Sequence, residues 1–332
     1  MNEISRRTFF KRTLASIAAS TLVLASGNKT AEAGDTVQYG TFIDLTRCDG
    51  CAGKDVPACV NACRQKNQHN FPQPQEPIQP YWPQTKFEDW SRKKHLTDKL
   101  TPYNWTYVQP VEVKHNGKTF KLNIPRRCMH CDNPPCANLC PFGVHNKTKE
   151  GAVVIDRDYC MGGAKCRDVC PWDIPQRQAG VGIYLKMAPK LAGGGVMYKC
   201  DLCIDLVKKG QEPSCVQACP QKALIFGEKE EMRKLAHRRA KEISGYIYGE
   251  KENGGTSTFY VSPVPFDKIH KSIMAKKKQA PKPERIGIPG MEPAVENYLD
   301  SANGTLAGYL IAPVAGAFAA GITAIKTMKG GE

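Results

Sequence analysis

The sequence predicts an α+β fold of two nested, internally repeated units with insertions, followed by a single C-terminal transmembrane helix. Three observations support this prediction. First, the 332-residue chain gathers its fifteen cysteines into four tight groups. Second, short runs of β-branched and aromatic residues lie beside these groups. Third, no charged residue occurs between Asp300 and Lys326, which leaves a long apolar segment near the end of the chain.

The cysteine groups share one spacing. Each complete group opens with C-x2-C and closes with C-x3-C, and three of the four closing cysteines precede a proline. The arrangement resembles the bacterial ferredoxin pattern C-x2-C-x2-C-x3-C-P, whose cysteines hold cubane iron–sulphur clusters. In the third group, Gly163 occupies the place of the second cysteine. The four groups are Cys48, Cys51, Cys59, Cys63; Cys128, Cys131, Cys136, Cys140; Cys160, Cys166, Cys170; and Cys200, Cys203, Cys215, Cys219.

Two other readings of the cysteines remain. An exported chain can use them in disulfides, although the count is odd and disulfide-dense scaffolds are mostly short. Paired C-x2-C knuckles also bind structural zinc, but zinc pairs do not usually recur with a C-x3-C-P ending. Residues four apart in a short helix lie on one face, a full turn apart. The closing cysteine is therefore well placed to reach a second metal centre, as in two-cluster ferredoxins.

Residues 1–33 are expected to form a twin-arginine signal peptide. Residues 5–11 have the form S-R-R-x-F-x-K, an apolar stretch follows at 14–24, and Ala31 and Ala33 provide a small-residue cleavage site. Metal binding is coupled to folding, so a chain that is loaded with metal before a folded export step avoids oxidation of bare thiols. The signal and the cysteines support each other.

Residues 301–328 are expected to form the transmembrane helix. Their apolar part, residues 305–325, is rich in alanine and glycine and long enough to cross the hydrocarbon core. Lys326 and Lys329 follow, and the positive-inside rule places that tail in the cytoplasm. The rest of the chain then lies on the periplasmic face. Small residues recur every four positions, as a stripe that lets another helix approach: Gly308, Ala312, Gly316 and Ala320.

The basic composition does not predict nucleic-acid binding. The formal net charge is +15 at pH 7, with every cysteine counted as neutral. An oxidised cluster with its thiolates carries about −2. Loss of the signal peptide and binding of four clusters bring the mature chain to roughly +4.

The order of the groups predicts how the units are nested. Groups two and three lie close together in an inner ferredoxin-like unit, residues 128–196. Groups one and four must meet in space if each closing cysteine reaches a partner centre, which gives an outer unit of residues 34–63 and 197–270. Strands are expected at residues 41–45, 152–156, 223–226 and 258–261, and a charged helix at residues 228–242.

The remaining segments are an insertion and a linker. Residues 64–127 are rich in proline and tryptophan, and their runs at 105–114 and 119–123 flank Asn116-Gly117, a strong hairpin signal. Trp82, Trp90 and Trp105 form either a partner surface or core packing. Residues 271–300, with repeated proline and glycine, are expected to be a linker.

The pattern as a whole resembles the four-cluster iron–sulphur (beta) subunits of membrane-bound periplasmic oxidoreductases. This family includes subunits of periplasmic nickel–iron hydrogenase, formate dehydrogenase-N, nitrate reductase and dimethyl sulfoxide reductase. The resemblance covers residues 40–265 and is strongest at R-C-M-H-C (residues 127–131), C-P-W (170–172), Y-K-C-D-L-C (198–203) and A-C-P (218–220). Residues 248–256, the export signal and the single C-terminal helix look most like the hydrogenase branch.

The resemblance implies a crossed set of ligands. Two clusters would join groups one and four, and two would join groups two and three. The last site lacks a fourth cysteine at Gly163, where the nitrate reductase relative also lacks one and holds a three-iron cluster. The implied sets are Cys48, Cys51, Cys59, Cys219; Cys200, Cys203, Cys215, Cys63; Cys128, Cys131, Cys136, Cys170; and Cys140, Cys160, Cys166.

The expected function is electron transfer and not catalysis. The resemblance implies three [4Fe-4S] clusters and one [3Fe-4S] cluster, or a [4Fe-4S] cluster without a fourth cysteine at Gly163. The expected partners are a periplasmic catalytic subunit, with nickel–iron or molybdopterin, and an integral-membrane quinone-reactive or cytochrome b subunit. Two alternatives stay open: an enzyme that binds substrate at the Gly163 cluster, and a zinc-binding exported scaffold.

Overall fold

The computed structural model describes residues 37–78, 88–187 and 194–329. The predicted signal peptide and Trp82 lie outside these ranges. Within them, the largest sheet has four strands in the order β8 (Leu224–Glu228), β1 (Tyr39–Asp44), β10 (Thr258–Ser262) and β9 (Tyr246–Tyr248). The strands expected beside the first and fourth groups, and the one expected at 258–261, are confirmed.

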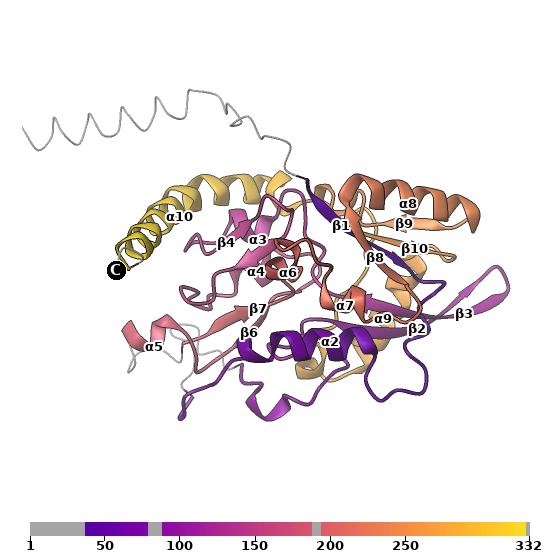
Figure 1. The fold of residues 1–332 in the computed structure, drawn as a ribbon, viewed down its shortest axis with the longest axis horizontal. Helices are drawn as coiled ribbons and strands as arrows, with labels where there is room; N and C mark the ends of the chain where they lie inside the picture. Colours follow the sequence, from indigo (N-terminus) through magenta and orange to yellow (C-terminus); the bar gives the residue numbers. More distant parts are fainter. Residues whose placement is uncertain (1–36, 79–87, 188–193, 330–332) are drawn as a thin grey trace, which may run out of the picture. The chain divides into compact units, whose positions relative to one another are not determined.

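The pairing of β1 joins distant parts of the chain. It runs antiparallel to β8, with Ile43 opposite Leu224, and parallel to β10, with Thr41 opposite Thr258. Helix α8 (Lys229–Glu242), as expected from the sequence, covers this sheet (Figure 1). Its contacts bury a small apolar cluster of Phe42, Phe259, Val261, Met232, Ala236 and Ala240. The strand before group one is thus fixed beside the strand after group four.

Three two-stranded sheets complete the β structure. The predicted hairpin is confirmed: β2 (Tyr107–His115) pairs with β3 (Lys118–Arg126), and Asn116 and Gly117 have the positive φ angles, 48° and 72°, that a tight turn requires. Near the middle groups, β4 (His145–Lys147) pairs with β5 (Val153–Ile155) and β6 (Gln176–Gln178) pairs with β7 (Val196–Tyr198). Strand β5 matches the run expected at 152–156.

In each group one short helix carries the cysteine before the closing one, and only α2 (Ala58–Asn67) also contains the closing cysteine. These helices are α2, α3 (Pro135–Asn138), α4 (Lys165–Asp168) and α7 (Ser214–Gln217), and α6 (Ile204–Val207) follows the fourth C-x2-C. A proline precedes the first turn of α2, α3 and α7, where its fixed φ suits the start of a helix. Helix α2 contacts α7, and α3 contacts α4.

The predicted linker differs from the structure over its first part. Helix α9 (Phe266–Gln279) extends into it and carries the lysine run at 276–278. Its buried residues Phe266, Ile269 and Ile273 recur at helical spacing and pack on the core, and α9 contacts β2. The sequence interpretation gave more weight to the prolines that follow at 281 and 283 than to this apolar stripe. A 3₁₀ turn, Lys282–Arg285, follows α9.

The tryptophans of the insertion that the structure describes are core residues. Trp90 and Trp105 are 7% and 2% exposed. The indole of Trp105 donates a hydrogen bond to the carbonyl of Pro102 at 2.8 Å, and the Arg157 guanidinium lies 5.2 Å from its ring centre. Of the two readings of these tryptophans, core packing is correct for this pair.

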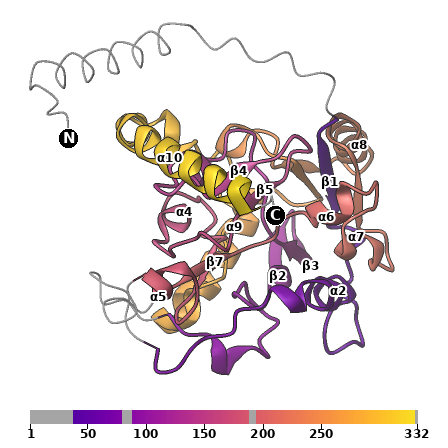
Figure 2. The same cartoon turned by 60° about the vertical axis from the view of Figure 1, so that its left-hand side comes forward.

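The last helix, α10 (Ala302–Lys329), is the apolar helix that the sequence predicts. Its segment Ala302–Met328 contains an 18-residue stretch with a mean hydropathy of 1.7 and is long enough to cross a membrane. In the structure it lies alongside β4 (Figures 1 and 2), with the rings of Phe318 and Phe142 5.7 Å apart. Near its end, Lys326 forms an ion pair with Asp156 at 2.5 Å. Small helix α5 (Ile183–Met187) lies beyond β6 in the chain.

Candidate metal centres

All fifteen cysteines are free thiols, and eleven of them are buried. The four half-buried ones are Cys48, Cys51, Cys170 and Cys219. The structure therefore does not support the disulfide interpretation of the cysteines. Buried thiols at such density need a reason, because a soluble core of this size is normally filled with aliphatic side chains.

The first and last groups meet at one site. Cys48, Cys51, Cys59 and Cys219 line a common small cavity, together with Asp49, Pro220 and the end of β8. Burial, and after it the charges of Cys219 and Cys51, raise the pKa of the Cys48 thiol to about 11. Burial also raises the pKa of Cys59. The structure thus brings Cys219 to the first group, away from the opening cysteines of its own group.

The fourth cysteine of the first group makes the reciprocal exchange. Cys63 is buried, and burial followed by the charges of Cys200, Cys215 and Cys203 raises its pKa well above the usual value. The amide of Asn67 donates a hydrogen bond to the Cys63 sulphur at 3.6 Å. Cys63 therefore lies among the cysteines of group four.

The middle groups repeat this exchange. Burial, then the charges of Cys136, Cys128 and Cys170, raises the pKa of Cys131. Cys170, the closing cysteine of group three, thus neighbours group two, and burial raises its pKa to about 12. Three cysteines remain, and they line a separate cavity of about 220 Å³: Cys140, Cys160 and Cys166.

Gly163 lines the same cavity as these three cysteines. The predicted missing-ligand position therefore lies at the site where a fourth thiol is absent. His145 lines the cavity too, and neither of its ring nitrogens has a hydrogen-bond partner within the described residues. Burial holds the pKa of His145 well below its usual range, so the ring is neutral.

The loop around Gly163 shares one backbone feature with the other three. In every group, the second residue after the opening cysteine has a positive φ: Gly50, His130, Gly162 and Leu202. Such a turn points successive backbone N–H groups inward, which favours a bound anion. Gly50, His130 and Leu202 are each followed by a cysteine, whereas Gly162 is followed by Gly163. The loops differ one position after Gly163, because Ala164 has a φ of 59° and the corresponding residues of the other groups have no positive φ.

The thiol sets are too widely spaced for single ions. Within residues 37–78, 88–187 and 194–329, no three His, Cys, Asp or Glu side chains lie close enough to hold one metal ion. A tetrahedral zinc ion with Zn–S bonds of about 2.3 Å needs sulphurs within about 4 Å of one another. A cluster of several irons with bridging sulphides fits the sets better, because its cysteine ligands stand farther apart.

The sulphur atoms already accept hydrogen bonds from the protein. Asn253 donates to Cys131 at 3.1 Å, the Leu202 amide to Cys200 at 3.4 Å and the Met197 amide to Cys160 at 3.5 Å. Bonds of this kind tune the redox properties of bound clusters. Sequence reasoning did not find Asn253, which reaches its sulphur from a segment far along the chain.

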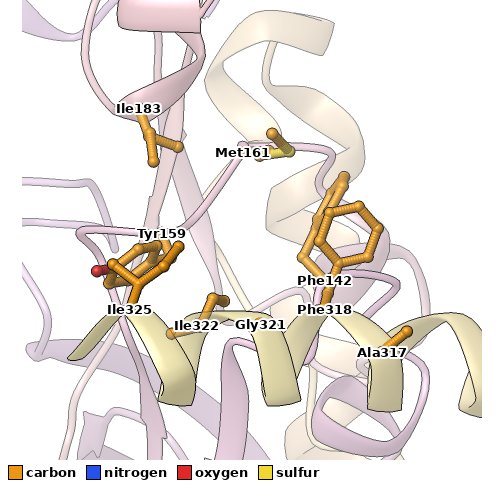
Figure 3. Close-up of a pocket in the computed structure, with 9 residues that line it drawn as sticks. All are labelled: Phe142, Tyr159, Met161, Ile183, Ala317, Phe318, Gly321, Ile322 and Ile325. Atoms are coloured by element: carbon orange, nitrogen blue, oxygen red, sulfur yellow. The ribbon is translucent and has the colours of Figure 1, made fainter. Parts of the chain in front are cut away.

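An apolar, partly open pocket of about 380 Å³ lies between the three-cysteine region and α10 (Figure 3). Met161, next to Cys160, and Phe142, two residues after Cys140, face the helix across it. The other lining residues are Tyr159, Ile183, Ala317, Phe318, Gly321, Ile322 and Ile325. The apolar helix and the site without a fourth cysteine are therefore neighbours in the structure.

Comparison with known proteins decides the family. Two family models described as a 4Fe-4S dicluster domain match residues 47–144 and 119–229. The hydrogenase-2 operon protein HybA of Escherichia coli O157:H7 is 31% identical over 268 residues, which are 69% of this chain and 71% of that protein. The chain belongs to the iron–sulphur subunit family of oxidoreductases. Members of this family transfer electrons and are not catalytic by themselves.

Other iron–sulphur subunits of the family cover the chain to different extents. The formate dehydrogenase-O iron–sulphur subunit of Escherichia coli K12 is 32% identical over 231 residues, 68% of this chain and 66% of that protein. A protein of Nitratidesulfovibrio vulgaris is 30% identical over 249 residues, 73% of this chain. The chain spans 59% of that relative's length.

Proposed function

We propose that this iron–sulphur subunit holds four clusters and passes electrons between a periplasmic catalytic subunit and a quinone or cytochrome site in the membrane. The proposal is supported by two cavities in which cysteines of different groups meet, one lined by Cys48, Cys51, Cys59 and Cys219 and the other by Cys140, Cys160 and Cys166. When bound, each cluster would act as a one-electron carrier. The residues of the chain hold them, exclude water and set their potentials.

The proposed ligands are the four crossed sets. Three [4Fe-4S] clusters take Cys48, Cys51, Cys59, Cys219; Cys63, Cys200, Cys203, Cys215; and Cys128, Cys131, Cys136, Cys170. The fourth site takes Cys140, Cys160 and Cys166 and holds a [3Fe-4S] cluster. Two nested ferredoxin-like units follow from this crossing, and the β1–β8 pairing and the α2–α7 and α3–α4 contacts support it.

The cluster beside Gly163 is proposed as the member with the highest potential. A three-iron cluster is all-ferric when oxidised and has one electron-donating thiolate fewer, so this cluster accepts an electron more readily. Its place next to α10 supports a position toward the membrane end of the row. We further infer export by the twin-arginine route and anchoring by α10 at the periplasmic face.

A nickel–iron hydrogenase is the first candidate for the catalytic partner, because a hydrogenase-2 operon protein is among the relatives. The second candidate is a molybdopterin enzyme, favoured by the similarity to a formate dehydrogenase subunit. Affinity purification of the tagged chain from its native membranes, followed by metal analysis of the co-purified complex, separates the two. Nickel supports the first and molybdenum or tungsten the second.

Two further outcomes oppose the proposal itself. A colourless chain that contains zinc excludes bound clusters and supports a zinc scaffold. A purified chain that turns over hydrogen or formate alone makes the subunit an enzyme. We expect a brown protein with broad absorbance near roughly 400 nm and no turnover without its partner.

A further inference from the structure

Arg127 is a buried cation without an adequate counter-charge among the described residues. Its side chain is 2% exposed. Its Nη1 lies 3.8 Å from the sulphur of Cys200, and its Nε and Nη2 have no hydrogen-bond partner in the described part of the chain. A guanidinium stays charged in proteins, and a buried charge is costly unless it is paired. A neutral thiol at 3.8 Å does not supply that pairing.

The cysteine that Arg127 faces does not belong to its own group. Arg127 directly precedes Cys128 in the sequence. Burial lowers the pKa of its guanidinium, and the interactions that raise this pKa most are nevertheless those with Cys200 and Cys215, from group four. An anionic cluster held by group four would provide the missing counter-charge and, through its sulphides, acceptors for the unpaired N–H groups.

The His130 side chain also contacts a cysteine of group four. Its Nδ1 accepts a hydrogen bond from the Val153 amide at 2.9 Å, so the proton of the neutral ring is on Nε2. Nε2 lies 3.6 Å from the sulphur of Cys200. With the Leu202 amide at 3.4 Å, the Cys200 sulphur therefore has three donors around it, and two of them come from the segment 127–130.

Lys199 occupies the equivalent place before group four and faces the opposite way. It is 4% exposed, and its ammonium donates to the carbonyls of Val153 and, at 3.1 Å, Cys200. The cysteine charges that act on it most strongly are those of Cys128 and Cys136. Each of the two buried cations thus lies one residue before a C-x2-C turn and acts on the thiols of the other group.

We propose that Arg127 is a positioning residue that raises the reduction potential of the cluster on Cys63, Cys200, Cys203 and Cys215, and not that of the cluster on its sequence neighbour Cys128. This inference rests on the proposed function, because it presumes that both clusters are bound. The cation stabilises the added electron on the reduced cluster, so its removal favours the oxidised form. These two clusters are then tuned across the junction between the units.

The test is a redox titration monitored by EPR on the full chain, purified with its partners, as wild type and as Arg127→Gln. The Cys203→Ser variant identifies the signal of the group-four cluster. In Arg127→Gln we expect the reduced-to-oxidised ratio of this cluster at a fixed potential to fall about tenfold, which is 59 mV for one electron. The ratio for the Cys128 cluster should change less than about threefold, by the distance dependence of charge interactions.

Arg126→Gln is the matched control. Arg126 is also 2% exposed, but its guanidinium donates to the carbonyl of Gly290 and not to a cysteine. Its replacement should leave the ratio of the group-four cluster nearly unchanged. A shift of the Cys128 cluster equal to that of the group-four cluster, or no shift in Arg127→Gln, overturns the inference.

A second measurement needs no substitution. Wild-type protein labelled with ¹⁵N only in the guanidinium nitrogens of arginine should show a nitrogen coupling in the pulsed EPR spectrum of the group-four cluster and not in that of the Cys128 cluster. Coupling at the wrong cluster, or at neither, overturns the inference even where Arg127→Gln fails to fold. Absence of iron and sulphide from the wild-type chain instead overturns the proposed function, so the two failures are distinguishable.

Discussion

Gly163 is the residue at which the four cysteine groups stop being alike. Its loop keeps the positive φ at Gly162 that the other groups have at the same place, and its three remaining cysteines line one cavity. Gly163 itself is not among the residues with positive φ, so its backbone accepts a side chain without the strain of a left-handed conformation. The loop is therefore prepared for a thiol that the sequence does not supply.

The Gly163→Cys variant should convert the three-iron site into a four-iron site. A fourth thiolate completes the ligand set and holds the iron that the wild type lacks. The oxidised wild-type protein should show the EPR signal of a three-iron cluster near g of about 2, and the variant should lose it. Gly163→Ala, which adds a side chain without a thiol at the same position, is the control that should keep the signal. A three-iron signal that persists in Gly163→Cys contradicts the assignment.

The crossing of the closing cysteines makes a second prediction for single residues. Cys219→Ala should disrupt the cluster of Cys48, Cys51 and Cys59, because Cys219 lines their cavity. Its EPR signal should change, while that of the cluster on Cys200 and Cys203 remains. Cys63→Ala should do the reverse, since Cys63 lies among group four. Damage confined to the group that contains the substituted cysteine would show that the ligands do not cross.

At the scale of elements, the sequence predicted the helices and strands whose positions depend on local residue patterns. Strands β1, β5, β8 and β10, the hairpin of β2 and β3, helix α8 and the apolar helix α10 all lie where alternation, turn residues or helical spacing placed them. Helix α9 was missed, because its three buried residues signal a helix only when there is a core for them to pack on.

The side chains that contact the cysteine sulphurs could not be predicted from the sequence either. The segments that carry Arg127 and Asn253 are close to their sulphurs only in the folded chain, and no spacing rule joins residues 73 or 122 positions apart. The cysteine spacing gave the candidate ligands, because turn geometry and the ligand distances of a cluster are local. Which sulphur each polar side chain serves depends on tertiary packing, and that part required the structure.

The position of helix α10 in the structure and the proposed membrane-spanning position exclude each other. In the structure, Lys326 near its end pairs with Asp156, and Ala315 and Ala319 pack against Gly143. A helix that crosses the membrane with Lys326 on the far side must release the ion pair. An exposed pair of this kind stabilises by only about 0–1 kcal/mol, so insertion of the apolar surface readily outweighs it.

Removal of residues 301–332 should therefore release the chain from membranes. The full chain should remain in the membrane fraction after an alkaline wash, because a spanning helix is held by its apolar surface. The shortened chain should move to the soluble fraction while it keeps its absorbance near roughly 400 nm, which reports intact clusters. Asp156→Asn, which removes the ion pair alone, should leave the full chain in the membrane. Equal partition of the full and shortened chains contradicts anchoring by α10.

Over the whole molecule, metal binding and folding are one process. Cysteines form part of the main hydrophobic core, together with residues of the hairpin and the sheet. Burial raises the pKa of Cys48 and of Cys215 from 9.0 to about 11, so without metal these thiols are neutral in the folded chain. Iron ligation requires the thiolate and releases the proton. The stability of the fold thus depends on the clusters.

Removal of iron should make the fold sensitive to alkaline pH. A thiol with a pKa raised by folding stabilises the metal-free fold fully below about pH 9, and that contribution is lost as the pH rises toward 11. The urea midpoint of the iron-free chain should fall between about pH 8 and about pH 10. The iron-loaded chain, whose thiolates are ligated, is the control and should change less. An equal response of the two forms would mean that these thiols do not bind iron.

The most direct test of the four-cluster assignment is the iron and acid-labile sulphide content of the full chain, purified without exposure to air. Three [4Fe-4S] clusters and one [3Fe-4S] cluster predict about 15 irons and about 16 sulphides per chain, with no stoichiometric zinc. A chain with about 8 irons or fewer after full reconstitution, or with zinc in place of iron and sulphide, would contradict it.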